Sequence, residues 1–162
     1  MKAEMTTHVL CVLAATFAVI ATTVNLSAQA ADSFAGVWRL NVAKSTYEAG
    51  PAPKISTNRL EKSADGWKGT QEQIDAQGKL LRLEATFEFD GREYPVVGLP
   101  NVTWTFTAIT EYVYEQVAKR DGKVILKSRN VVSTDGKTRT ETRVVTNAEG
   151  RTFTNSLVWE KQ

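Results

Sequence analysis

The sequence is nearly free of cysteine and histidine. It holds one of each among 162 residues, and both stand near the start, at Cys11 and His8. The rest of the chain therefore has no residues for disulfides, thiol nucleophiles, histidine-based catalytic triads, or the usual zinc and haem sites. It also lacks the regularly spaced Asp and Asn residues of a calcium-binding loop. We expect no metal and no cofactor.

Long hydrophobic runs are also absent, apart from one near the start. Residues 1–30 contain an early lysine, a run of 12 mostly apolar residues at 9–20, and a small-x-small tripeptide at 28–30. This order is typical of a signal peptide cleaved after Ala30. The run is too short to span a bilayer, which needs about 20 residues. We expect an exported domain at 31–162, periplasmic or extracellular, that does not insert into a membrane.

An excess of charge of one sign is lacking too. The 20 basic and 18 acidic residues give a net charge of +2, with the histidine neutral. This is too small to indicate binding to nucleic acid or to an anionic membrane surface. We expect no nucleic-acid partner, and nothing in the sequence indicates an oligomeric state.

The sequence does contain a regular series of glycines. They stand at positions 66, 78, 91, 122, 136 and 150, each after Asp, Gln or Glu. The intervals are 12, 13, 31, 14 and 14 residues, so the long one is about two periods. We expect a turn without glycine inside that interval, at Thr110-Glu111. Regular turns between β-rich segments predict an all-β meander.

No segment after residue 30 shows sustained helical periodicity. We expect an all-β fold, an antiparallel up-and-down meander closed into a barrel of 8–10 strands. A single helical turn is expected at 43–49, ahead of Pro51 and Pro53. The strands are expected at 35–41, 55–63, 67–75, 79–89, 92–97, 102–110, 112–119, 123–133, 137–146 and 151–160.

The tripeptide at 136–138 (GKT) raises the alternative of a phosphate-binding loop. Such a loop needs another glycine five residues before its Gly-Lys pair, where this chain has Val131. It also needs a helix that begins at the lysine. Residues 138–143 instead read T-R-T-E-T-R, which is the period-two alternation of a strand. We interpret Asp135-Gly136 as a hairpin turn.

Alternation indicates which side chains face the barrel interior. In 79–89 one face carries Leu81, Leu83, Ala85, Phe87 and Phe89, so Arg82 points outward. In 137–146 we place the threonines inside and Arg143 outside. The interior would then be a mixture of aromatic, aliphatic and small polar side chains.

Small polar side chains inside a barrel cost free energy unless they find hydrogen-bond partners. One interpretation is a lumen that binds a small molecule, and the alternative is a solid core in which hydroxyls bond the backbone or water. Because no charged residue is assigned to the interior, the expected ligand is neutral. The expected ligand-binding residues are Trp67, Phe87, Trp104, Phe106, Asn130 and Thr140.

Two short motifs resemble those of the calycins, which include lipocalins and fatty-acid-binding proteins. Residues 34–40 (FAGVWRL) resemble the first strand, and 157–161 (LVWEK) resembles the last strand of a fatty-acid-binding protein. The resemblance implies that Gly36, Trp38 and Trp159 form a structural plug at one end of the barrel.

A longer resemblance covers nearly all of 31–162. The chain is similar to a group of small secreted bacterial proteins known only as lipocalin-like, which implies fold and export but no reaction. Fatty-acid-binding proteins hold a carboxylate with Arg-x-Tyr on the last strand, whereas this chain has Leu157 and Trp159 there. Fatty-acid binding is therefore not implied. The matching segments are WRLNVAKS (38–45), GPAPK (50–54), DGREYPVVG (90–98), VVSTDGKT (131–138) and VWEK (158–161).

Three functions follow as hypotheses. The first is a secreted protein that binds a small, neutral, apolar or aromatic molecule in the barrel. The second is a protein-interaction module with a solid core. The third is an isomerase or hydrolase that uses a carboxylate and a tyrosine. Its candidate is Glu115, whose pKa would be raised if its face were buried. The alternative for that strand is that Glu115 is solvated and Tyr112 and Tyr114 face inward.

Overall fold

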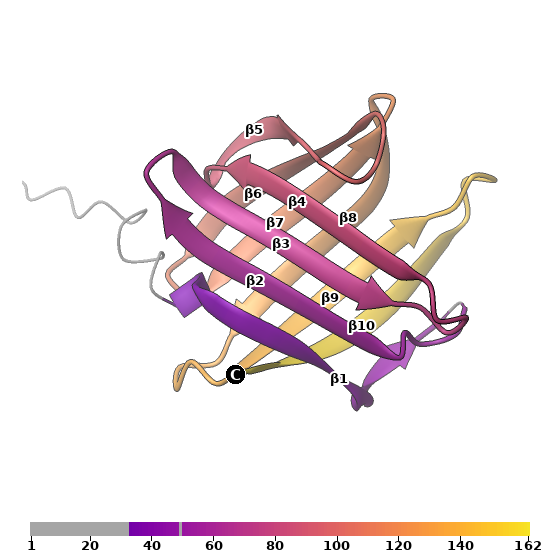
Figure 1. Ribbon diagram of the computed structural model, residues 1–162, viewed down its shortest axis with the longest axis horizontal. Helices are drawn as coiled ribbons and strands as arrows, with labels where there is room; N and C mark the ends of the chain where they lie inside the picture. The colour runs from indigo at the N-terminus through magenta and orange to yellow at the C-terminus, as the bar shows by residue number, and fades with distance from the viewer. Residues whose placement is uncertain (1–32, 49) are drawn as a thin grey trace, which may run out of the picture.

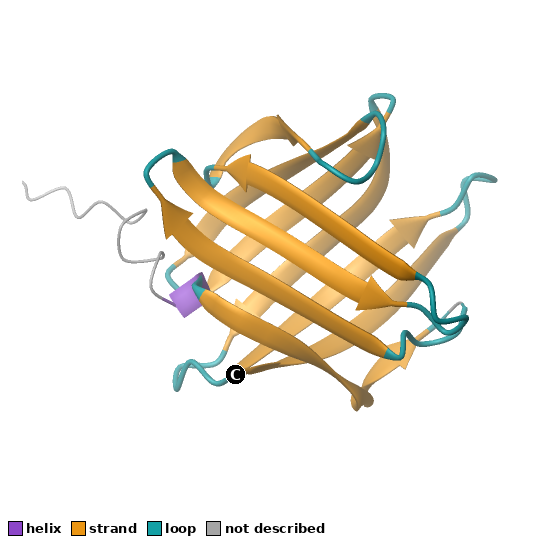
Figure 2. Ribbon diagram, viewed as in Figure 1, coloured by secondary structure: helices purple, strands orange, loops and turns teal. Residues whose placement is uncertain are grey.

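The computed structural model describes residues 33–48 and 50–162, so the expected signal peptide at 1–30 lies outside the described residues. The described chain is an antiparallel all-β barrel (Figures 1 and 2). Its ten strands are β1 (Gly36–Tyr47), β2 (Ile55–Ser63), β3 (Gly66–Ile74), β4 (Leu80–Phe87), β5 (Asp90–Pro95), β6 (Val102–Thr110), β7 (Val113–Arg120), β8 (Lys123–Val132), β9 (Thr138–Thr146) and β10 (Thr152–Lys161).

The ten strands form one sheet in the order β4-β3-β2-β1-β10-β9-β8-β7-β6-β5. The first and last strands pair with each other, for example through Leu40 and Trp159. The barrel nearly closes between β4 and β5, where one bridge joins Glu84 to Val97. In that bridge each backbone N–H donates to the partner's carbonyl oxygen, at 3.0 and 2.8 Å. The expected meander and barrel are confirmed.

The glycine series marks the turns as expected. Glycines 78, 122, 136 and 150 lie within turns, and glycines 66 and 91 lie at the start of β3 and β5. All six have positive φ, between 68° and 109°, which residues with a Cβ adopt rarely. The turn without glycine falls at Glu111-Tyr112, one residue later than predicted.

The helical turn expected at 43–49 is wrong, because β1 continues to Tyr47. A bulge between Asn41 and Thr46 absorbs the extra residues. Within it the Ser45 hydroxyl donates to the Asn41 carbonyl at 2.7 Å and accepts from the Val158 backbone N–H at 3.0 Å. A serine side chain thus takes the place of a ladder hydrogen bond, and the strand resumes beyond it.

The predicted inner face holds for β4, β6 and β10 but is wrong for β9. Thr140 is exposed, while Arg139 and Glu141 are each 2% exposed. Arg143 lies on the same inner face, and Arg82 lies outside on β4 as expected. The register of β9 therefore places its charged residues inside and its threonines outside.

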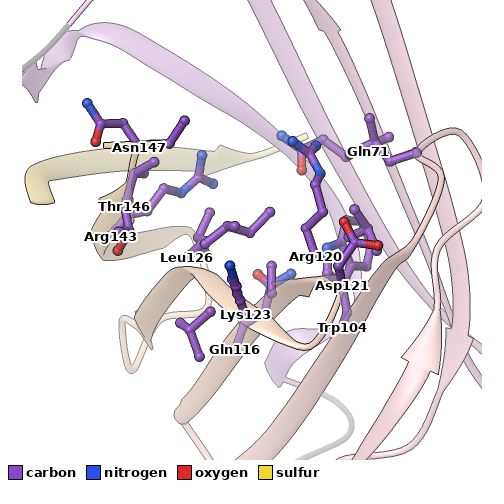
Figure 3. A pocket seen from close by; sticks show the side chains of 18 of the residues that line it. Gln71, Trp104, Gln116, Arg120, Asp121, Lys123, Leu126, Arg143, Thr146 and Asn147 are labelled. Atoms are coloured by element: carbon purple, nitrogen blue, oxygen red, sulfur yellow. The ribbon is translucent and has the colours of Figure 1, made fainter. Parts of the chain in front are cut away.

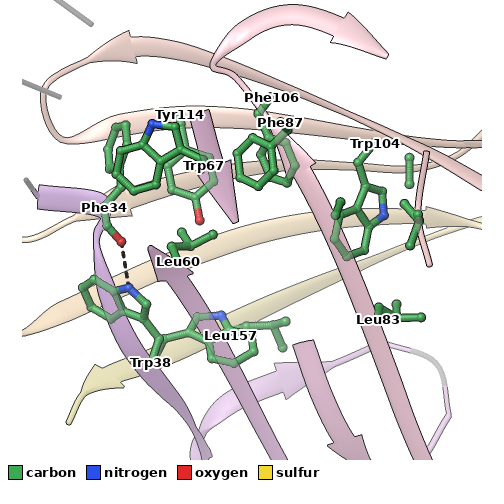
Figure 4. Close-up of a cluster of buried hydrophobic side chains, with 14 of the residues drawn as sticks. Phe34, Trp38, Leu60, Trp67, Leu83, Phe87, Trp104, Phe106, Tyr114 and Leu157 are labelled. Carbon is green, nitrogen blue, oxygen red and sulfur yellow. Dashed lines mark hydrogen bonds between the residues drawn. The ribbon is translucent and has the colours of Figure 1, made fainter. Parts of the chain in front are cut away.

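Aromatic side chains fill one half of the barrel, which we call the packed half and define by Trp38, Trp67, Phe87 and Trp159 (Figure 4). Phe87 and Phe106 stack with ring centroids 3.8 Å apart. Further edge-on and tilted ring contacts connect Phe34, Trp67, Phe89, Tyr94, Trp104 and Tyr114 to this pair. Such contacts add to the free energy of apolar burial.

Trp38 lies at the floor of the packed half and is completely buried. Its indole N–H donates to the Phe34 carbonyl at 3.0 Å (Figure 4). The Lys161 ammonium lies 5.1 Å from its ring centroid, and the Arg139 guanidinium lies 5.2 Å away. Gly36 has a φ of 132°, which residues with a Cβ rarely adopt, and a Cβ added there would lie 2.5 Å from the flexible end of the Lys161 side chain. The C-terminal strand thus seals the floor.

Candidate functional site

The other half of the barrel is open inside, and we call it the hollow half, defined by Leu83, Ala118, Leu126 and Arg143. It contains a cavity of about 740 Å³ (Figure 3). The cavity opens between the turn that joins β7 to β8 and the turn that joins β9 to β10. Its wall is largely aliphatic and includes Leu81, Leu83, Leu99, Val102, Ala118, Leu126 and Val145.

A smaller chamber of about 160 Å³ lies beside this cavity, under the loop that contains Pro51 and Pro53. Gln71, Gln73 and Arg143 line both spaces. The smaller chamber is more polar, because its other lining residues include Tyr47, Ser56 and Asn155. The interior of the hollow half therefore has an apolar part and a polar part with a shared wall.

Ser56 is the most unusual of these polar residues. It is 1% exposed, and its hydroxyl has no hydrogen-bond partner among residues 33–48 and 50–162. A buried hydroxyl without a partner costs about 1–3 kcal/mol. The Ser56 hydroxyl in the small chamber therefore has one hydrogen bond that a ligand could complete.

Three charged residues on the inner face of β9 connect the two halves. The Arg143 Nε donates to Glu141 Oε1 at 2.7 Å, and Trp159 Nε1 donates to Glu141 Oε2 at 3.0 Å. The Arg139 guanidinium lies 4.9 Å from the Trp159 ring centroid. Burial acts to raise the pKa of Glu141, but the nearby charges of Arg143 and Arg139 and the two hydrogen bonds outweigh it, so the pKa is lowered. Glu141 is therefore a buried carboxylate anion.

The hypothesis of a carboxylate and tyrosine enzyme loses its candidate residue. Glu115 faces outward and pairs with Arg129 at 2.8 Å, as the alternative interpretation of that strand predicted. Tyr114 faces inward, where its hydroxyl accepts a hydrogen bond from Arg139 at 2.6 Å. Burial raises the pKa of Tyr114 to about 12, so its phenol stays protonated at neutral pH.

The residues that the sequence assigned to one pocket are divided between the two halves. Trp104 lines the cavity. Phe106 and Asn130 line a void of only about 20 Å³ between the halves, where Asn130 donates to the Ser128 hydroxyl. Trp67 and Phe87 belong to the packed half. Thr140 faces solvent, so the predicted convergence on one pocket is wrong.

Sequence reasoning missed the residues that give the hollow half its polarity, namely Ser56, Gln71, Gln116 and Arg143. Figure 3 labels the last three of them. Gln71 and Gln116 face inward with the period-two spacing of Trp67 on β3 and of Tyr114 on β7. The same alternation analysis, applied to β3 and β7, would have found both. The inward direction of Arg143 had no such signal, because both faces of β9 alternate equally well.

A scan against protein-family models finds no match to this chain, and a search of curated proteins finds none either. Over the described ranges 33–48 and 50–162, no helix is long and apolar enough to cross a membrane. Over the same ranges, no three His, Cys, Asp or Glu residues are grouped so as to hold a metal ion.

Proposed function

We propose that this protein binds a small, mostly apolar molecule in the cavity of the hollow half. The observation that carries the proposal is the aliphatic cavity of about 740 Å³. Ligand sites are typically about 300–1,000 Å³ and combine apolar walls with a few polar groups. Burial of apolar ligand surface here would contribute about 25 cal/mol per Å².

The division of the barrel supports this proposal. A barrel with a solid core needs no unfilled volume, and close packing is the rule in protein interiors. Here the packed half obeys that rule, while aliphatic side chains such as Leu126 and Val145 face open space in the hollow half. Contact between an apolar wall and water is unfavourable, so an apolar ligand that displaces this water would bind favourably.

We further propose that the barrel is a lipocalin-like protein that works after export from the cytoplasm. Support comes from the buried Trp38 at the start of β1, the closing strand β10 that packs a cation on it, and the leader expected at 1–30. Purified exported protein should have Ala31 as its first residue, which intact mass measurement would show.

An interaction module is the second candidate, favoured by one surface feature. Val97 is 71% exposed at the seam where a single bridge joins β4 and β5, and Leu80 at the start of β4 is 62% exposed. Exposed apolar residues beside incompletely paired strands are a known basis for association. This candidate predicts a concentration-dependent mass in solution that a Val97→Lys substitution abolishes.

The cavity proposal is tested with N-phenyl-1-naphthylamine, a neutral apolar dye that fluoresces when it leaves water. The wild-type protein should bind it with saturable, one-to-one stoichiometry. Ala118 lines the cavity, so Ala118→Phe should fill part of it and weaken binding at least tenfold. Val117 is the preceding residue and faces outward, so Val117→Phe is the matched control.

Two results would refute the cavity proposal. One is the absence of saturable dye binding by folded wild-type protein. The other is an equal loss of binding in the Ala118→Phe and Val117→Phe variants, because that would place the dye elsewhere than in the cavity.

A further inference from the structure

The interior of the barrel holds more positive than negative charge. Arg139, Glu141 and Arg143 are the charged residues that line the void between the halves and the small chamber. Two guanidinium groups therefore share one carboxylate. A buried charge without a counter-charge is costly, so such an excess is most stable where water or an anion can reach it.

Arg139 is held deep in the packed half, although its buried Nε has no hydrogen-bond partner among residues 33–48 and 50–162. Its Nη1 donates to Asn58 Oδ1 at 2.9 Å and to the Tyr114 hydroxyl at 2.6 Å. The rings of Trp38 and Trp159 lie 5.2 and 4.9 Å from its guanidinium carbon, so it is also stabilised by cation–π contacts. The excess positive charge is therefore not exposed to the cavity at Arg139.

Arg143 is different because its guanidinium, which is also only partly engaged, reaches the cavity. Its Nε donates to Glu141, while no hydrogen bond or ion pair within the described chain uses its two terminal amino groups. Its side chain is 19% exposed and lines both the cavity and the small chamber. Two free, parallel N–H donors in a partly desolvated wall match an anionic group that carries two oxygens.

The small chamber supplies a second, independent indication of a polar ligand group. The Ser56 hydroxyl is buried there without a partner, and the Gln73 and Asn155 amides line the same space. The volume of about 160 Å³ is large enough for a head group but not for the body of an apolar ligand. The chamber is thus lined both by the Ser56 hydroxyl, which has no partner among the described residues, and by the incompletely paired Arg143 guanidinium.

From these observations we infer that the ligand is an amphiphile with one anionic head group. Its head lies in the small chamber, against the terminal amino groups of Arg143 and the Ser56 hydroxyl, and its apolar body lies in the larger cavity. This inference rests on the proposed function and corrects the neutral ligand expected from the sequence. The anchor stands on β9, whereas the last-strand residues Leu157 and Trp159, which line the same chamber, are apolar.

Two dyes with the same ring system separate head group from body. One is N-phenyl-1-naphthylamine, and the other is 8-anilinonaphthalene-1-sulfonate, which adds a single sulfonate. Arg143→Gln should weaken binding of the sulfonate dye about tenfold, equivalent to about 1.4 kcal/mol, and leave the neutral dye within about twofold. Arg82→Gln, on the outer face of β4, is the matched control and should change neither affinity by more than about twofold.

A second variant keeps the test decisive if Arg143→Gln does not fold. Ser56→Ala removes a hydroxyl that has no hydrogen-bond partner among residues 33–48 and 50–162, so it should leave the melting temperature unchanged or raise it. It should nevertheless weaken binding of the sulfonate dye several-fold without affecting the neutral dye.

Each result has one meaning. Selective loss of the sulfonate dye in either variant supports the anionic head group. Equal effects on both dyes, or no effect on either, overturn it while the cavity proposal stands. If folded wild-type protein binds neither dye, the cavity proposal itself fails.

Discussion

The packed half and the hollow half of this barrel are built from the same strands, yet they differ in what their inner faces carry. β4 places Phe87 and Ala85 in the packed half and Leu83 and Leu81 in the hollow half. β3 changes in the same way, from Trp67 to Gln71. Within each strand, bulky rings give way to smaller or polar side chains over a few residues.

The comparison shows how one barrel can combine stability with an open interior. The rings of the packed half exclude water and hold Arg139 among them, which stabilises the fold. The hollow half has smaller side chains on the same ladder of backbone hydrogen bonds, so its strands are held in place without a filled centre. Glu141 joins the halves, because it accepts one hydrogen bond from Trp159 and another from Arg143.

The largest expected effect is at the floor of the packed half. Trp38→Ala should lower the free energy of unfolding by about 3–5 kcal/mol, as truncation of a buried aromatic residue does, and the melting temperature by roughly 10 °C or more. Leu80→Ala, on the exposed rim, is the control and should change little. A melting temperature unchanged by Trp38→Ala would show that the packed half is not the stabilising half.

A pair of leucines compares the halves directly. Leu60 is 2% exposed in the packed half, whereas Leu126 lines the cavity. Leu60→Ala should cost about 2–5 kcal/mol, because it creates a void. Leu126→Ala should cost clearly less, since its neighbours already face open space. Chemical denaturation measures both, and equal losses would contradict the distinction between the halves.

A smaller effect is expected from the link between the halves. The pKa of Glu141 is below its ordinary value of 4.5, so its ionised form stabilises the fold above that pH, and the contribution is lost as the pH falls through the lowered pKa. Glu141→Gln should cost about 1–3 kcal/mol at pH 7 and make stability less sensitive to acid below about pH 4.5.

The control for this prediction is Glu160→Gln, which removes an exposed carboxylate on β10. Its effect on the acid sensitivity of unfolding should be smaller than that of Glu141→Gln. Identical stability–pH curves for wild type and Glu141→Gln would show that the buried carboxylate does not connect the halves energetically.

Much of the fold could be predicted because short stretches of sequence determine the turns and most of the inner faces. Glycines after acidic or amide residues mark the hairpins, and the ends of nearly all strands fall within about two residues of the positions predicted. The apolar alternation of β4 and β6 fixes their inner faces. The extension of β1 was missed because the Ser45 hydroxyl, which replaces a ladder hydrogen bond, acts with a residue far away in the sequence, Val158.

The site was less predictable, because neither face of its main strand, β9, is apolar enough to indicate which one points inward. In T-R-T-E-T-R a shift of one residue exchanges the threonines with the charged residues. The lower polarity of threonine favoured placing the threonines inside. The fold instead provides partners for Arg139 from β2 and β7 and for Glu141 from β10, and Arg143 pairs with Glu141 on the same strand. The partition of aromatic residues between halves also depends on packing across the barrel, which no single strand reveals.

The central claim, that one half is filled and the other hollow, is tested most directly by one matched pair of substitutions. Ala85 and Ala118 are 3% and 4% exposed, but only Ala118 lines the cavity. In a chemical denaturation measurement, Ala85→Phe should lower the free energy of unfolding by about 1–3 kcal/mol through overpacking. Ala118→Phe should lower it by clearly less, or raise it. Equal destabilisation by the two substitutions would contradict a hollow half.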